Sequence, residues 1–265
     1  MKDKILDSFG QLSLSNPVLT RTGWLNWMLA AILMVLAPFD SRTILGINPW
    51  IKPLKFSVSI AIYVWTLAWY LRYLSRRRRA VRSISWGVAI SVVFEIVGIT
   101  LQSARGVPSH FNVATPLDAT LFAVMGGMIG FNTVMLIWAT VLFFVDRPDV
   151  PAAYLWGIRF GLIIFLLASF EGVLMVMHGS HTVGAADGGA GLPLVNWSRQ
   201  HGDLRVVHFV GMHALQVLPL AGYWIGRSGS QEGAKVVYTA AVFLLYLGAM
   251  ALLFRMAWQG HPLAL

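Results

Sequence analysis

Long apolar runs, interrupted by short polar turns, dominate the chain from Trp24 onward. A helix needs about 20 predominantly apolar residues to cross the hydrocarbon core of a bilayer. Such runs recur along the chain, and turn-forming segments such as residues 147–151 separate them. The pattern predicts an all-α, polytopic membrane helix bundle of about seven transmembrane helices. The expected spans are residues 24–39, 54–74, 84–104, 117–145, 153–177, 204–225 and 234–258.

The first 20 residues differ from the rest because charged and apolar positions are mixed there. Ile5, Leu6, Phe9 and Leu12 share one helical face, which predicts a short interfacial helix. We therefore divide the chain into an N-terminal interfacial segment, residues 1–20, and a single transmembrane helical domain, residues 21–265.

Composition agrees with a membrane protein, since only 12% of the residues are charged and soluble domains carry about 25%. The chain has no cysteine, which excludes disulfides, thiolate metal ligands and iron–sulfur clusters. The formal charge is +9, but the basic residues cluster beside apolar spans. We therefore expect membrane lipid, including anionic lipid, as a partner, and no nucleic acid.

The strongest topological signal is the run Arg76–Arg79 between the second and third expected spans. Positively charged loops stay in the cytoplasm, so we interpret this run as a topology anchor. Alternation of the spans then predicts a bacterial-type cytoplasmic (inner) membrane protein with its N-terminus in the cytoplasm and its C-terminus outside.

With this orientation, all seven histidines are expected on the outer side of the membrane. Imidazole is the commonest metal ligand and suits zinc, copper, iron and haem. The pattern predicts haem or a transition metal (copper, iron or zinc) near the extracytoplasmic surface. His208 and His213, within the sixth span, are the first candidates for cofactor binding. The candidate metal ligands are His110, His178, His181, His208 and His213.

Two lysines, Lys52 and Lys55, stand at the outer end of the second span among prolines. They are candidates for binding an anionic group, such as a haem propionate or a lipid phosphate. The alternative is that they only extend toward the membrane surface.

Two carboxylates, Glu95 and Glu171, lie inside apolar spans, where each must be neutral or paired. Their depth places them near His213, so we expect these groups to meet in one buried pocket. There they would handle protons, orient a ligating imidazole or hold helices together. Asp187, in contrast, lies in a glycine-rich loop, where we expect water to solvate it.

A short internal similarity joins the third and fifth spans. The segment Val93-Phe94-Glu95 matches Ser169-Phe170-Glu171, and a polar residue follows each glutamate seven positions later. Both spans run in the same direction, which indicates a parallel repeat of helix pairs 3–4 and 5–6.

The stretch from Glu171 to Leu220 resembles one half of the haem A synthase proteins. The resemblance rests on a span with a carboxylate, a glycine-rich loop with Pro193-Leu194, and a following span with His208 and His213. It implies a haem-binding helix bundle in which one of these histidines ligates haem. The chain departs from the family in lacking its His-Arg pair, its loop cysteines and its eighth span.

The leading hypothesis is a redox protein that transfers electrons or oxidises a membrane-soluble substrate, with a quinone or a redox protein as partner. Glu95 and Glu171 would be its catalytic, proton-handling groups. A rival is a proton- or cation-coupled transporter or channel that uses Glu95, Glu171 and His213. A third hypothesis is a membrane assembly factor whose histidines only bond between helices.

Overall fold

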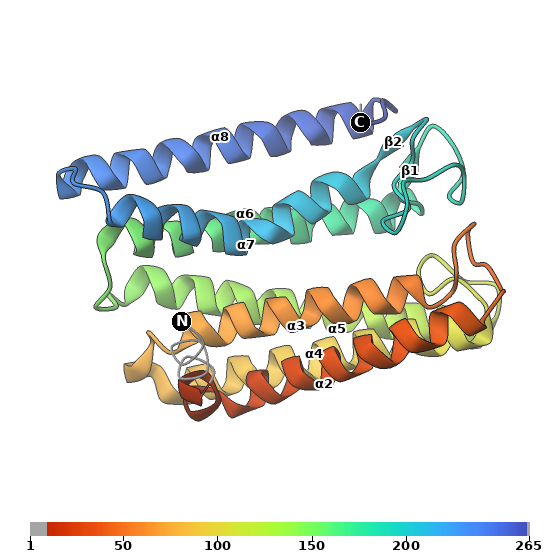
Figure 1. The fold of residues 1–265 in the computed structure, drawn as a ribbon, viewed down its shortest axis with the longest axis horizontal. Coiled ribbons are helices and arrows are strands. Elements are labelled where there is room, and N and C mark those ends of the chain that lie inside the picture. Colours follow the sequence, from red (N-terminus) through yellow and green to blue (C-terminus); the bar gives the residue numbers. More distant parts are fainter. Residues whose placement is uncertain (1–9, 264–265) are drawn as a thin grey trace. The chain divides into compact units, whose positions relative to one another are not determined.

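A computed structural model describes residues 10–263 and is all-α apart from one short strand pair (Figure 1). Within this range, seven helices are long and apolar enough to cross a membrane, which confirms the predicted polytopic bundle. The spanning helices are α2 (Pro17–Leu36), α3 (Ile51–Leu71), α4 (Arg78–Arg105), α5 (Pro116–Val145), α6 (Ala152–His178), α7 (Leu204–Gly226) and α8 (Glu232–Trp258). The short elements are η1 (Ala37–Phe39), η2 (Ser75–Arg77), β1 (Thr182–Val183) and β2 (Gly202–Asp203).

Local chemistry explains where α2 begins, seven residues before the expected Trp24. The side-chain oxygen of Asn16 accepts a hydrogen bond from the amide of Leu19 at 3.2 Å, and Pro17 occupies the first helical position. The span therefore starts inside the segment that we expected to be interfacial. Ile5, Leu6 and Phe9 lie outside the described residues.

The chain forms two compact units, which meet in sequence between Leu142 and Phe143. In the first unit, glycines of α4 admit long side chains of α5. A Cβ atom at Gly87 would lie 2.7 Å from the sulfur of Met135, and one at Gly98 would lie 2.5 Å from the sulfur of Met125. These glycines allow α4 and α5 to approach closely.

In the second unit, α6 and α7 pack backbone against backbone and α8 covers them. A Cβ atom at Gly157 would lie 2.6 Å from the carbonyl oxygen of Leu218. One at Gly222 would lie 2.4 Å from that of Ala153. Buried residues from all three helices form the core: Ile164, Ala168, Val207, Ala214, Leu218 and Met250.

A small antiparallel pair joins the end of α6 to the start of α7 (Figure 1). Thr182 pairs with Asp203 and Val183 with Gly202, and the backbone of Gly202 lies against Ala257 of α8. The pair fixes the two ends of the loop of residues 184–201 beside the end of α6 and the start of α7.

The repeat of helix pairs stays a prediction. The Pro-Leu pairs that follow the two spans differ in position, because Pro116 begins α5 whereas Pro193 lies in the loop between β1 and β2. The two copies of Phe-Glu do occupy comparable places, since both lie in the second half of a long helix, α4 or α6.

Candidate functional site

Glu171 of α6 and His208 of α7 form a pair inside the second unit. The Nδ1 atom of His208 lies 3.0 Å from the Oε2 of Glu171 and 3.0 Å from the carbonyl oxygen of Ala168. A backbone carbonyl can only accept a hydrogen bond, so Nδ1 carries the ring proton and donates to both oxygens. In the neutral imidazole Nε2 then presents a lone pair, and no described residue is hydrogen-bonded to it.

Gly172 makes room for this imidazole. A Cβ atom at position 172 would lie 3.2 Å from Cε1 of His208 and 3.6 Å from its Nδ1. The ring therefore rests against the backbone of α6, and the two hydrogen bonds together with this contact fix its orientation.

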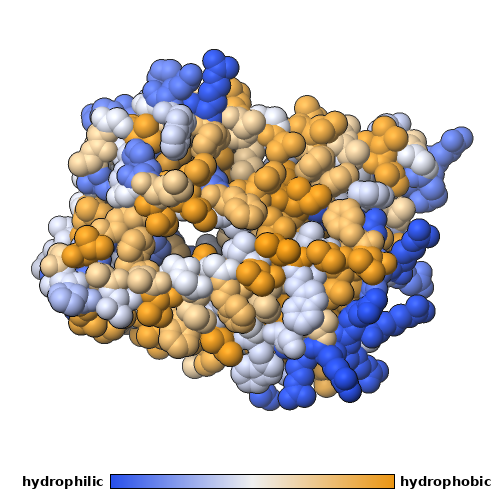
Figure 2. All heavy atoms as spheres, turned by 180° about the vertical axis from the view of Figure 1, so that it is seen from behind, coloured by the Kyte–Doolittle hydropathy of each residue, from blue (hydrophilic) through white to orange (hydrophobic). Residues whose placement is uncertain are grey.

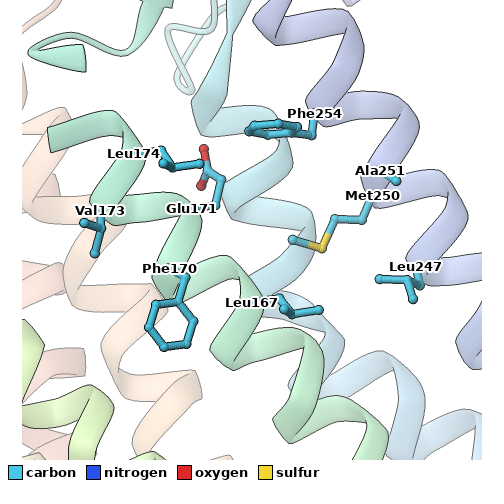
Figure 3. A pocket seen from close by; sticks show the side chains of 9 residues that line it. All are labelled: Leu167, Phe170, Glu171, Val173, Leu174, Leu247, Met250, Ala251 and Phe254. Carbon is cyan, nitrogen blue, oxygen red and sulfur yellow. The ribbon is translucent and has the colours of Figure 1, made fainter. Parts of the chain in front are cut away.

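Glu171 also borders a groove of about 460 Å³ between α6 and α8 (Figure 3). The other lining residues are apolar, and Figure 3 shows Glu171 as the one polar side chain among them. The residue is only 5% exposed, and its Oε1 atom is buried without a hydrogen-bond partner among the described residues. A buried carboxylate oxygen without a donor is costly, so Oε1 is an unused acceptor just below the surface of the groove.

A second pair lies inside the first unit, between Glu95 of α4 and His110 of the loop that follows. The Nε2 of His110 is 3.4 Å from the Oε1 of Glu95. Its Nδ1 is 3.3 Å from the Nζ of Lys52 and 3.1 Å from the hydroxyl oxygen of Ser109. The lysine ammonium can only donate, so Nδ1 accepts, and the ring N–H is on Nε2, which faces the Glu95 carboxylate. Unlike His208, His110 has both ring nitrogens engaged.

Aromatic rings surround His110. Its ring centroid lies 6.0 Å from that of Phe56, 6.2 Å from that of Phe111 and 6.1 Å from that of Phe122. Phe111 has a φ of 56°, a conformation that non-glycine residues seldom adopt. This strained backbone position directly follows His110, whose imidazole faces Glu95.

Within the second unit the expected meeting of Glu171 with His213 is not observed, and the expectation that Glu95 of the first unit shares their pocket stays a prediction. Each carboxylate pairs with a histidine of its own unit, and the partner of Glu171 is His208. The Nδ1 of His213 lies 2.8 Å from the carbonyl oxygen of Phe209, one turn earlier in the same helix. Positions 208 and 213 are five residues apart, so they face different directions around α7.

His178 and His181 do not share a helical face either. Gly179, with a φ of +75°, ends α6 directly after His178. His178 contacts Ser180, whose hydroxyl lies 2.9 Å from its Nδ1, and His181 turns to Asp187, 2.9 Å from its Nδ1.

Asp187 is not the solvated loop residue that we expected. Its carboxylate accepts hydrogen bonds from the amides of His181 and Thr182 as well as from the His181 ring. Burial raises the pKa of Asp187, but the bonds from His181 and Thr182 outweigh that effect and hold the pKa well below its usual range. Asp187 therefore organises the loop after α6.

Asp118, at the start of α5, has a structural role that was not expected from the sequence. This carboxylate accepts hydrogen bonds from Gln102 at 2.8 Å and Thr115 at 2.6 Å, and it forms an ion pair with Arg105 at 2.5 Å. The spacing Thr115-x-x-Asp118 is a capping pattern and was the available signal. The cluster ties the end of α4 to the start of α5.

Lys52 lies beside the first pair, and Lys55, close by on α3, is partly buried. Both belong to the first unit, whereas His208 and His213 belong to the second. In residues 10–263, no group of three or more His, Asp or Glu side chains is close enough to hold a metal ion. The five candidate metal ligands are therefore distributed over separate local interactions.

No known protein family, curated protein or solved structure matches this chain. The chemistry of the two glutamate–histidine pairs is thus the basis for a functional proposal.

Proposed function

We propose that this chain is a membrane redox protein that binds haem through Nε2 of His208 and acts on a lipid-soluble substrate such as a quinol. The observation that carries the proposal is the anchored imidazole. Its Nδ1 donates to Glu171 and Ala168 at 3.0 Å each, which leaves Nε2 with a free lone pair.

The donor set fits haem better than a free metal ion. A zinc or copper ion bound by protein alone needs three or four ligands, and the described residues offer no such cluster. Haem brings four ring nitrogens and can be held by one axial histidine. Haem would supply a one-electron redox centre, and the carboxylate behind His208 makes Nε2 a stronger donor. The resemblance of residues 171–220 to haem A synthase proteins agrees with this choice.

Glu171 would serve the substrate through its second oxygen. The groove between α6 and α8 is apolar, and Leu167 and Phe170 on its wall are 42% and 56% exposed. A quinol ring would lie on such a surface, and a small rotation of the Glu171 side chain would let one hydroxyl donate a hydrogen bond to the unpartnered Oε1. In this arrangement Oε1 of Glu171 accepts the proton of the substrate hydroxyl. Oε2 of Glu171 keeps its hydrogen bond with Nδ1 of His208.

We also propose that the protein lies in a bacterial-type inner membrane with the arginine-rich α3–α4 loop in the cytoplasm. The histidine-bearing loop between α6 and α7 then faces outward, which gives His208 access to an extracytoplasmic redox partner protein. The support for this orientation is the distribution of Lys and Arg.

A proton- or cation-coupled transporter is the second candidate, because a second carboxylate–histidine pair exists in the first unit. Lys52, His110 and Glu95 form a chain of polar contacts, at 3.3 Å and 3.4 Å, that ends at a carboxyl group only 4% exposed. Such chains can conduct protons. This candidate would use His110 and His208 in place of His213.

The visible spectrum of the purified protein tests the proposal. We would produce the protein in cells that are supplied with a haem precursor, purify it in detergent and record the Soret band and the haem-to-protein ratio. About one haem per chain is expected. A protein that stays colourless under these conditions, and after incubation with added haem, would refute the haem proposal and favour the transporter.

A further inference from the structure

The connection between α3 and α4 presents four consecutive arginines, Arg76–Arg79, at the end of the first unit away from Glu95 and His110. Leu71 and Leu74 are each only 1% exposed and fix the end of α3 and the turn that follows. The short helix η2 then begins at Ser75, and α4 begins at Arg78. The arginines are therefore carried by ordered helical backbone, and all four side chains are exposed.

These arginines line a groove of about 680 Å³ that also includes Ser75, Ala80, Ser83 and Trp138. Its volume is typical of small-molecule sites. The lining contains guanidinium and hydroxyl donors but no carboxylate. Figure 2 shows a dense group of hydrophilic side chains beside apolar surface at the end where this loop lies.

Three of the four arginines in the groove keep their charges unpaired among residues 10–263. Arg76, Arg78 and Arg79 make no hydrogen bond or ion pair with the described residues. The nearby Arg72 behaves differently, because its guanidinium stacks on Trp69 at 3.5 Å and donates to the hydroxyl of Tyr73 at 3.2 Å. The groove thus combines concentrated positive charge with free donors, which is the chemistry that binds phosphate.

We propose that this groove binds the phosphate headgroup of an anionic phospholipid. Trp138 belongs to the spanning helix α5 and is 38% exposed. Indole rings favour the membrane interface, where they would lie beside the glycerol and upper acyl chain of the lipid. The loop is thus more than the topology anchor that its sequence indicates, since it also offers a shaped site for one lipid.

Native mass spectrometry of the detergent-purified protein tests the site. Phosphatidylglycerol and phosphatidylcholine with identical acyl chains are added in turn, and bound lipid is counted. The variant with Arg76→Gln, Arg78→Gln and Arg79→Gln should bind phosphatidylglycerol about a hundredfold more weakly, at about fivefold for each arginine. The matched control carries Arg147→Gln, Arg199→Gln and Arg227→Gln, which removes the same charge elsewhere, and it should bind as the parent does.

A second variant preserves the charge that directs membrane insertion. Lysine at positions 76, 78 and 79 keeps the positive loop but lacks the paired donors of arginine. Its affinity for phosphatidylglycerol should fall about tenfold. The proposal is overturned if the lysine variant binds phosphatidylglycerol as tightly as the parent. It is also overturned if the control variant loses as much affinity as the glutamine variant, or if the parent binds phosphatidylcholine as tightly as phosphatidylglycerol. Displacement of the lipid by millimolar inorganic phosphate would identify soluble phosphate as the ligand instead, and would also overturn it.

Discussion

Replacing Gly172 by alanine should weaken the proposed haem site without damaging the fold. The new Cβ atom would lie 3.2 Å from Cε1 of His208, whereas carbon atoms in favourable contact are about 3.5–4.0 Å apart. The imidazole must therefore retreat by a few tenths of an ångström. Its Nδ1 bonds to Glu171 and Ala168 are now 3.0 Å long, and such a shift carries them past the usual limit of about 3.2 Å.

The size of the effect follows from the role of these bonds. Partners that orient a ligating histidine contribute about 10- to 100-fold to affinity. Because alanine at position 172 lengthens the bonds without removing either acceptor, we expect a loss at the lower end, about tenfold. Titration of the haem-free variant with haem, followed by Soret absorbance, measures it.

Gly127→Ala is the matched control. Gly127 also lies inside a spanning helix, and a Cβ atom there would meet nothing within 4 Å. Both variants gain the same helix propensity, so only the contact with His208 distinguishes them. If the Gly172→Ala and Gly127→Ala proteins bind haem with the affinity of the parent, the anchored imidazole is not the ligand and the reasoning fails.

Three further predictions follow from the same geometry. His208→Ala should lose most of the bound haem, while His213→Ala, whose ring is bonded within its own helix, should keep it; the reverse order in haem content would assign the ligand to His213. The low pKa of Asp187 means that its bonds with His181 stabilise the loop above the ordinary pKa of about 3.8 and fail as the pH falls below it. Hydrogen exchange of residues 179–203, corrected for intrinsic rates, should therefore accelerate only in that acidic range, and an equal change near neutral pH would contradict this. A reporter fused after Gly189 should give an extracytoplasmic signal, and a cytoplasmic signal would remove the basis for an outward-facing histidine site.

The sequence by itself determined the fold class and the seven spans, because the cost of exposing apolar residues to water acts locally on each run. All seven expected spans correspond to helices, and most boundaries agree within a few residues. The start of α2 differs from the expected start at Trp24. The Asn16 cap and Pro17 at the first helical position, rather than hydropathy, decide where that helix begins. The sequence also identified Glu95 and Glu171 as carboxylates that need partners.

Only the tertiary structure decided which partners they have. Glu171 could reach either histidine of α7 by depth, but the rotation of α7 against α6 turns His208 toward it and His213 away. The α6–α7 packing that holds this rotation includes close backbone approaches at Gly157 and Gly222, each about four helical turns from the site. Depth along a helix follows from counting residues, whereas direction around a packed helix depends on contacts from other segments.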